Sequence, residues 1–409
     1  MTSTALGQSR GFEGGRWSAL ALGASIPISI AIDNLLLAIV LLTWLIGGQL
    51  RTKLRVALHN PVYRAAALLF GVLLLGLLYG SAGWNDARLH ISKYLELALI
   101  PVIGWAFMDE KNRGAGLRVF AGALFTVLVL SYAFKGGVLP PNPWMHGNPQ
   151  TPLVFKLRLT HNILMAFAAF VFAWLALSAG SRRSKLLWSA ASALAVVNVT
   201  LMIDGVTGYL VLGALTLLLG WQHARFKGIG ITVASAALAL GVLMVVPSAF
   251  QTRTQQVIGE LQREDATRPA TTSAGFRMEF YRNTLALVAR NPIFGSGTGS
   301  FPALYAEQVK GSGRVATRNP HNEFLLLTVQ TGIFGLGAFL WLLWQQWRYA
   351  PSLPTPMERG LARGLVITMI IVCLLNCALL DHTEGLLYAW LTALLYAGLP
   401  GGRETGIQT

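Results

Sequence analysis

Residues 160–180 read THNILMAFAAFVFAWLALSAG, an almost uninterrupted apolar run. A helix of about 20 apolar residues crosses the hydrocarbon core of a bilayer. Similar runs recur along most of the 409 residues, of which 54% are hydrophobic and only 12% are charged. Soluble proteins carry roughly 25% charged residues on average. We therefore predict an all-α integral membrane protein.

Hydropathy predicts about twelve transmembrane helices, at residues 17–32, 34–50, 62–81, 87–108, 115–134, 160–180, 185–203, 206–222, 228–250, 321–347, 360–380 and 384–400. Only Asp33 and Asn34 join the first two. Three regions result: residues 1–250 with nine helices, a large loop at 251–320 with short amphipathic helices, and residues 321–409 with three helices and a tail. We expect no cleaved signal peptide, because Met1–Arg16 is polar and glycine-rich.

Alternate loops differ in charge. The short loops near residues 51–64, 111–118, 182–185, 225–227 and 348–363 are rich in Lys and Arg. Because cytoplasmic loops carry such an excess, these loops and both termini are predicted to be cytoplasmic. The same rule explains most of the net charge of +15, and no nucleic-acid motif accompanies it.

The large loop at 251–320 faces the opposite, outer side in this topology. It contains nine basic residues against five acidic ones, which the orientation rule does not require. Arginine clustered at a membrane surface suits bidentate binding of phosphate or pyrophosphate. Attraction to lipid headgroups is the alternative for any single arginine.

One segment of this loop predicts an amphipathic helix. Phe276, Phe280 and Leu287 share one helical face, and Asn291-Pro292 ends the pattern. Such a helix could hold Arg277 and Arg282 at headgroup depth. The glycines at 295, 297 and 299 then form a flexible or closely approached loop, with the wrong spacing for a dinucleotide fingerprint.

His321 is the sharpest single candidate. It follows Arg318-Asn319-Pro320 and opens the tenth predicted helix. A histidine at a membrane boundary beside basic residues suits a general base if it stays neutral. A structural role is the alternative, and Glu323 is expected on a different helical face.

Further charged residues lie at outer helix ends: Lys156 with Arg158 and His161, Lys93 with Tyr94, and Asp381 with Glu384. Lys93 could simply snorkel to the interface, and Asp381 could cap a turn. The two cysteines, Cys373 and Cys377, are expected to pack within one helix. No D-x-D, H-x-x-x-H or thiolate set marks a metal site, so we predict neither a metal ion nor a cofactor. Arginines would then have to stabilise negative charge.

Two stretches resemble the bacterial O-antigen ligase family, which is related to the O-antigen polymerases. GFRMEFYRNTLALVARNPIFGSGTGSF, from Gly275, carries Arg277, Tyr281 and a Pro-x-x-Gly-x-Gly turn. PHNEFLLLTVQTGIFGLGAF, from Pro320, matches the family's signature of a histidine and a glycine separated by ten residues, here His321 and Gly332. The predicted layout is also similar, and the resemblance implies a fold like that of GT-C glycosyltransferases. Many relatives carry an arginine at the position of Val206, so a contact from that turn is in doubt.

The resemblance implies transfer of a glycan from undecaprenyl pyrophosphate to a sugar hydroxyl of lipid A–core, at the periplasmic face of the bacterial inner membrane. His321 would then be the general base of an inverting, metal-independent displacement. The implied pyrophosphate contacts are Arg277, Arg282, Arg158, Lys93 and Arg318, with His161, Tyr281 and Asp381 as further site residues.

Three alternatives remain open at the level of the sequence. An O-antigen polymerase would use the same donor, and a protein O-oligosaccharyltransferase would use a protein acceptor. A transporter of an anionic lipid or glycan belongs to a different class. It is disfavoured because the charges lie at the outer rim and no internal repeat is evident.

Overall fold

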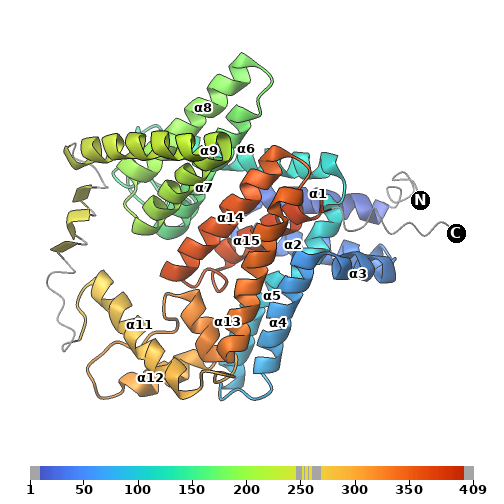
Figure 1. The fold of residues 1–409 in the computed structure, drawn as a ribbon, viewed down its shortest axis with the longest axis vertical. Helices are drawn as coiled ribbons and strands as arrows, with labels where there is room; N and C mark the ends of the chain where they lie inside the picture. Colours follow the sequence, from blue (N-terminus) through green and yellow to red (C-terminus); the bar gives the residue numbers. More distant parts are fainter. Residues whose placement is uncertain (1–9, 246–250, 253, 257, 260–268, 400–409) are drawn as a thin grey trace.

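The computed structural model describes residues 10–245, 251–252, 254–256, 258–259 and 269–399. Within these ranges the chain is almost entirely helical, and the only β pairings are isolated bridges at Met145–Val154 and Asn148–Thr151. Figure 1 shows the helices gathered into one bundle, with α11 and α12 at its lower end. The predicted all-α class is confirmed. Residues 253, 257 and 260–268 of the predicted large loop lie outside the described residues.

The α-helices follow in chain order: α1 (Arg10–Ser25), α2 (Ile30–Ile46), α3 (Leu50–His59), α4 (Pro61–Gly76), α5 (Trp84–Gly104), α6 (Glu110–Lys135), α7 (Arg158–Leu177), α8 (Arg182–Val197), α9 (Val206–Val245), α11 (Ser273–Arg290), α12 (Phe301–Val309), α13 (Glu323–Tyr349), α14 (Pro356–Leu375) and α15 (His382–Tyr396). Short 3₁₀ turns follow α5 and α13 (Trp105–Phe107 and Ala350–Ser352), and a π turn follows α8 (Asn198–Met202).

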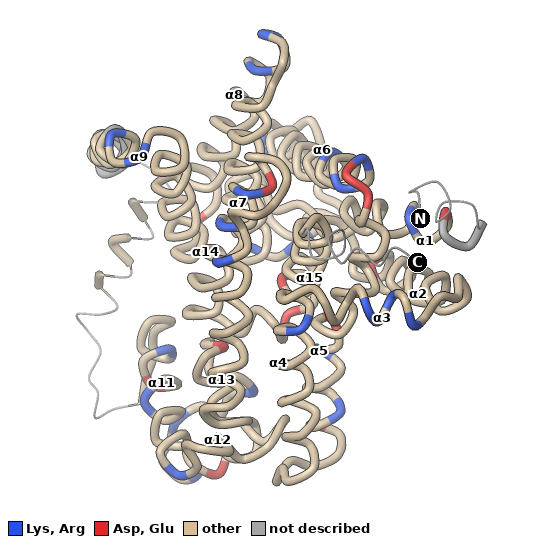
Figure 2. Tube along the Cα trace, turned by 45° about the vertical axis from the view of Figure 1, so that its right-hand side comes forward, with Lys and Arg blue, Asp and Glu red and all other residues tan. Residues whose placement is uncertain are grey.

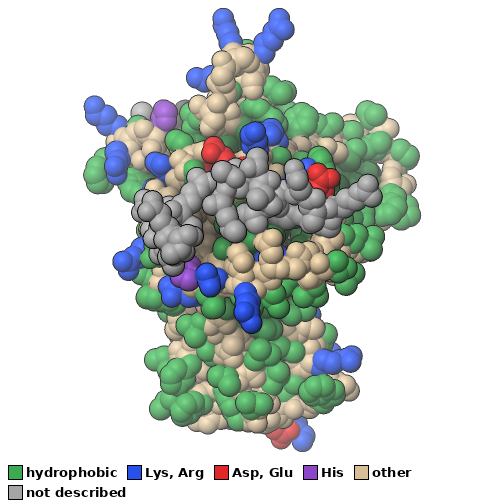
Figure 3. All heavy atoms as spheres, turned by 90° about the vertical axis from the view of Figure 1, so that its right-hand side faces the viewer, with side chains coloured by type: hydrophobic (Ala, Val, Ile, Leu, Met, Phe, Trp, Pro, Cys, Tyr) green, Lys and Arg blue, Asp and Glu red, His purple; other side chains and the backbone are tan. Residues whose placement is uncertain are grey.

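Within the described part of the chain, four helical segments are long and apolar enough to cross a membrane: Glu110–Lys135, Arg158–Leu177, Arg182–Met202 and Glu323–Ser352. A fifth results if α2 and α3, which meet at a bend of 114°, form one span. The chain is therefore a helical protein with membrane-capable segments, while the count of about twelve spans stays a prediction. Figure 3 shows hydrophobic side chains spread over much of one face, as a lipid-facing exterior requires.

The core centres on α15, which is buried from Thr383 to Tyr396. It packs on α5, α14, α6 and α1. Trp390 contacts Phe107 edge-on at 5.7 Å and Phe120 at 5.5 Å, and its Nε1 donates to the carbonyl of Ala19 at 2.8 Å. A helix that is apolar on all sides belongs inside a large bundle.

The turn between the first two helices differs from the prediction. The chain turns at residues 26–29, not at Asp33-Asn34, because Pro27 cannot donate the backbone hydrogen bond that continues a helix. Asp33 consequently lies in the first turn of α2, fully buried, and accepts a hydrogen bond from Ser25 Oγ at 2.5 Å.

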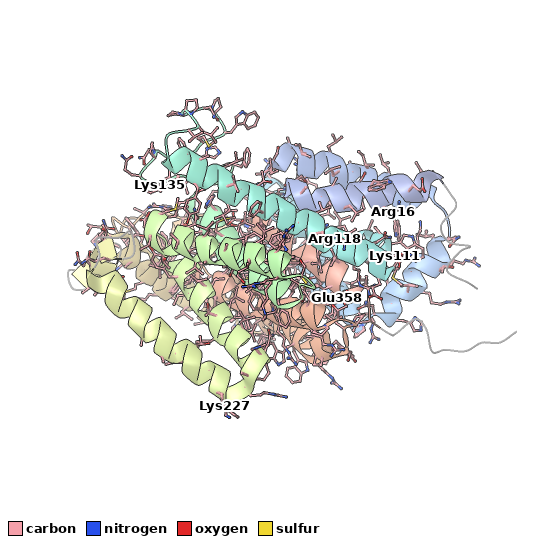
Figure 4. All side chains as sticks on the ribbon, turned by 90° about the horizontal axis from the view of Figure 1, so that it is seen from above. Arg16, Lys111, Arg118, Lys135, Lys227 and Glu358 are labelled. Carbon is pink, nitrogen blue, oxygen red and sulfur yellow. The ribbon has the colours of Figure 1, made fainter. Side chains whose placement is uncertain are left out.

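The predicted break between residues 222 and 228 is confirmed. Inside α9, Ala224 and Arg225 leave helical geometry, with φ of −135° and 53° respectively. Two helices meet there, close to the Lys227 labelled in Figure 4. A Cβ on Gly228 would lie 1.9 Å from the carbonyl oxygen of Gly220, so this turn requires glycine.

The loop with glycines 295, 297 and 299 packs between α4 and α13. Gly297 N donates to Gln330 O at 2.7 Å, and Thr298 N donates to Gly76 O at 3.1 Å. The helical geometry of α13 breaks at Gly332, beside this loop. Gly332 has a φ of 62°, and a Cβ there would lie 2.0 Å from Ile293 O. The backbones of α4 and α13 therefore approach this loop closely, and the contact depends on the loop glycines together with Gly332.

Candidate functional site

His321 lies just before α13 in a left-handed conformation, with φ of 54°. Its backbone N donates to Asn319 Oδ1 at 3.0 Å, and the neighbouring Asn322 caps α13 by accepting from Leu325 N at 3.0 Å. Non-glycine residues rarely adopt this conformation, which costs of order 1–3 kcal/mol and persists where the surroundings impose it. The left-handed backbone of His321 therefore fixes the direction in which its imidazole points.

Two other elements hold the His321 side chain. Nδ1 lies 3.0 Å from Oδ1 of Asn376, the residue that follows α14. The ring stacks on Phe280 of α11, with centroids 5.8 Å apart and planes 19° apart. Because an amide oxygen only accepts, Nδ1 is assigned the proton and Nε2 keeps its lone pair. The half-buried ring is thus oriented by Asn376 through Nδ1, and the basic nitrogen Nε2 takes no part in that hydrogen bond.

Tyr281 fixes α11 to the same place. Its hydroxyl donates to the carbonyl oxygens of Leu374 at 2.7 Å and His321 at 3.1 Å. Burial raises the pKa of Tyr281, so the phenol keeps its donor proton. Arg277, one turn earlier, is close enough to oppose that shift electrostatically. Of the predicted site residues, Tyr281 thus contacts His321, and Arg277 lies near Tyr281.

Asp381 and Lys93 also lie near His321. Lys93 Nζ donates to the carbonyl of Leu380 at 2.9 Å, next to Asp381. Burial raises the pKa of Asp381, while the positive charge of Lys93, and that of His321 when its ring is protonated, acts against that shift. The structure therefore brings Asp381 and Lys93 into electrostatic contact with the site.

The other predicted basic residues have different partners. Arg158 forms an ion pair with Asp204 at 2.8 Å, and Arg318 pairs with Asp86 at 2.9 Å. His161 is fully buried in α7, near Asn198 and the backbone of Val154. Arg282 is exposed on α11. Figure 2 shows Lys and Arg residues gathered along α11 and α12, below the main bundle.

A buried ionic cluster, defined by Asp33, Glu96 and His382, lies behind Asp381. His382 Nδ1 is 2.9 Å from Glu96 Oε1, and Nε2 is 3.6 Å from Asp33 Oδ2. These hydrogen-bonding carboxylates raise the pKa of His382 to about 9. Next to it, the nearly buried Lys156 donates to Thr383 Oγ1 at 3.1 Å. Burial lowers the pKa of Lys156, against the pull of Asp33 and Glu384.

Glu323 is buried, and its side chain binds partners different from those of His321. Its carboxylate accepts from the Tyr94 hydroxyl at 2.7 Å and from Leu379 N at 3.0 Å. It therefore ties α13 to α5 and to the α14–α15 turn. Among the described residues, no group of three His, Cys, Asp or Glu side chains is placed to hold a metal ion.

Sequence reasoning missed Asn376 and the buried ionic cluster. Asn376 carries no local signal, since a polar residue at the end of an apolar helix is usually a cap. Asp33 and Glu96 did give a signal, because acidic residues within apolar runs are costly and mark functional or structural networks. Nothing in the sequence, however, indicates that both pair with His382.

Comparison with known proteins bears on this region. Residues 199–340 match the family model described as O-antigen ligase. The match contains α11, α12, His321 and the glycine break of α13, whereas Asn376 and Asp381 lie beyond it. No curated protein matches the chain. Across residues 199–340 the chain is therefore similar to the O-antigen ligase family.

Proposed function

We propose that the protein is an O-antigen ligase, a glycosyltransferase that moves a glycan from undecaprenyl pyrophosphate to a sugar hydroxyl of lipid A–core. The observation that supports this most is His321, held by Asn376 and Phe280 inside the region that matches the family. A transfer to a hydroxyl needs at least one general base, and an imidazole with a free Nε2 meets that need.

In the proposed reaction, His321 Nε2 takes the proton of the acceptor hydroxyl. The hydroxyl oxygen then forms a bond to the anomeric carbon as the bond between that carbon and the pyrophosphate oxygen breaks. The electron pair leaves with undecaprenyl pyrophosphate, and the anomeric configuration inverts. The leaving group is already stable as an anion, so it requires charge neutralisation more than protonation.

Basic residues supply that neutralisation in the proposal. Arg277 and Arg282 lie on α11, the helix that touches His321 through Phe280 and Tyr281. We assign them to the donor pyrophosphate, where a guanidinium can bind two phosphate oxygens at once. Lys93, Arg158 and Arg318 are assigned as outer contacts, and they bind Leu380 O, Asp204 and Asp86 respectively within the chain. Asp381 faces the imidazolium that forms.

The proposed setting is the bacterial inner membrane, with both termini in the cytoplasm and the site in the periplasm. About twelve spans and a fold of the GT-C type belong to the same proposal. The basic loops predicted to be cytoplasmic support this orientation. The loop before α14 lies at one end of that helix, and Asn376, which contacts His321, lies at the other end.

Genetic complementation tests the proposal. In a strain that lacks its ligase, the wild-type chain should restore polymer-capped lipopolysaccharide on a gel. His321→Ala should abolish capping while undecaprenyl-linked polymer accumulates. The matched control is His59→Ala, because His59 is exposed at the end of α3. If His321→Ala keeps full activity with purified protein, the general-base assignment is wrong.

The same experiment separates the rival activity. A polymerase would use the same donor but extend a lipid-linked chain. Loss of His321 would then shorten the undecaprenyl-linked polymer to single repeats instead of leaving long polymer unattached. That result would replace the ligase proposal.

A further inference from the structure

A second basic site lies at the other end of α13 and α14 from His321. A cavity of about 240 Å³ opens between α7, α9 and the start of α14. α14 has 20 residues, so at 1.5 Å per residue roughly 30 Å separates its start at the cavity from its end beside Asn376. The cavity therefore belongs to a different region of the molecule from the proposed active site.

Three arginines line this cavity: Arg225, Arg359 and Arg363. No acidic residue lines it among the described part of the chain. Arg225 and Arg363 are close enough for their charges to repel each other. Three like charges converging without a counter-charge raise the free energy of the empty cavity, which a bound anion would lower.

The arginines are held in place by fixed partners. Arg359 Nε donates to Leu353 O at 2.7 Å, and its Nη2 donates to Pro354 O at 3.2 Å. Arg363 lies between Trp221, at 5.3 Å, and Trp347, at 5.6 Å from its guanidinium carbon. Arg225, in the break of α9 beside the labelled Lys227, lies 5.8 Å from the Trp221 ring (Figure 4). A planar guanidinium so arranged suits recognition of a phosphate.

Two buried donors at the cavity lack acceptors. Arg363 Nε and Trp174 Nε1 are both buried, and the described residues provide no hydrogen-bond partner for either. Trp174 packs closely against Gly360, where a Cβ would come within 2.2 Å of its ring. Buried donors are nearly always paired, so each such group calls for an explanation. Acceptor oxygens of a bound anion would satisfy both.

We propose that this cavity binds the phosphate of an anionic phospholipid headgroup. The shared chemistry is a phosphate with free oxygens, and a lipid is the source favoured by position. α7 and α13 are both membrane-capable helices, and Trp174 and Trp347 lie within one or two turns of their ends. Trp belts and basic pockets between helices are features of the membrane interface.

Binding can be measured on the purified full chain in detergent. Thermal unfolding is followed while phosphatidylglycerol, phosphatidylethanolamine or inorganic phosphate is added. We expect phosphatidylglycerol alone to raise the unfolding temperature. The double variant Arg225→Gln/Arg363→Gln should weaken the apparent affinity for phosphatidylglycerol at least tenfold. The matched control is Arg182→Gln/Arg183→Gln, which removes the same charge from the exposed start of α8 and should leave the affinity unchanged.

Three results would overturn the proposal. Equal loss in both double variants would mean general attraction to a basic surface. An equal response to phosphatidylethanolamine would remove the requirement for net negative charge. A full response to inorganic phosphate would make the cavity a site for a soluble anion. If the double variant fails to fold, Arg225→Gln alone carries the test, because Arg225 is exposed and its loss leaves the helix contacts of Arg363 in place.

Discussion

His321 is positioned by residues from three separate parts of the chain. Its own backbone is left-handed, Asn376 lies 3.0 Å from Nδ1, and Phe280 stacks on the ring. A histidine that only preceded a helix would not need its side chain held by residues from two other parts of the chain. Since the amide oxygen of Asn376 fixes the protonated nitrogen, Asn376 is a positioning residue for the proposed base.

Asn376→Asp should shift the pH dependence of glycosyl transfer. A carboxylate 3.0 Å from Nδ1 would stabilise the imidazolium relative to the neutral ring. Because a base must be deprotonated, the acid limb of kcat/KM should move to higher pH, by about one unit or more. Activity at neutral pH should fall, and recover in more alkaline buffer.

Asn148→Asp is the control, since Asn148 is exposed in the loop before α7 and this substitution adds the same charge. Its pH profile should match the wild type. A profile of Asn376→Asp that stays in place, with activity merely lower, would show that Asn376 does not act through His321.

His382 should make the fold less stable in alkaline solution. Its pKa is raised from 6.5 to about 9 by Asp33 and Glu96, so the folded state favours the protonated ring. The resulting stabilisation is complete below pH 6.5 and is lost as the pH rises through about 9. Thermal unfolding in detergent should show this decline, and His382→Gln should flatten it. An unchanged slope in His382→Gln would assign the decline to other groups.

At the scale of elements, the glycine loop determines how α11 and α12 join the bundle. Backbone hydrogen bonds attach it to Gly76 of α4 and to Val329 and Gln330 of α13. The break at Gly332 exposes the carbonyls that accept those bonds. α11 can therefore hold Phe280 and Tyr281 against the His321 region, although it lies outside the main bundle (Figure 1).

Gly332→Ala should destabilise this junction. The new Cβ would lie 2.0 Å from Ile293 O, and the positive φ adds about 1–2 kcal/mol for a residue with a side chain. We expect a clearly lower unfolding temperature and a loss of transfer activity. Gly337→Ala on the same helix meets no atom within 4 Å and should be neutral or slightly stabilising. Equal effects of the two substitutions would contradict the close contact at Gly332.

At the scale of the whole molecule, basic residues lie in several regions, and two of these regions are far apart. One lies along α11 and α12, and the other lies at the ends of α8, α9 and α14 (Figure 2). The predicted topology assigns the first to the periplasm and the second to the cytoplasm. The two regions are then separated by the apolar part of the bundle.

Site-specific labelling checks this orientation. Cys373 and Cys377 are buried, so a single exposed cysteine should dominate the labelling. In intact cells with a permeabilised outer membrane, Ser312→Cys should react with a membrane-impermeant maleimide, and Arg183→Cys should react only after lysis. The reverse pattern would invert the topology and move the proposed site to the cytoplasm.

Chelation tests the chemistry of the assembled site. If arginines alone neutralise the leaving pyrophosphate, EDTA should leave the transfer rate unchanged in a purified assay. Strong inhibition that an added divalent ion reverses would show that a metal takes part. Wild-type protein stripped and then reloaded with magnesium provides the matched comparison.

The sequence alone determined the features that depend on local patterns. Hydropathy predicted a helical membrane protein, and the spacing of Phe276, Phe280 and Leu287 predicted α11 with its end at Asn291. The basic run around Arg225 predicted the break in α9. These predictions succeed because helix formation and chain reversal depend mainly on neighbouring residues.

Only the tertiary structure decided which distant residues meet. Asn376 reaches His321 across 55 residues of chain. Asp33 and Glu96 converge on His382 from α2 and α5. The three arginines of the second cavity come from α9 and α14. An apolar helix shows by its composition that it is buried, but not how it is rotated or which neighbour it packs against. Those two choices arise only when all the helices pack together, and they place the proposed base beside its partners.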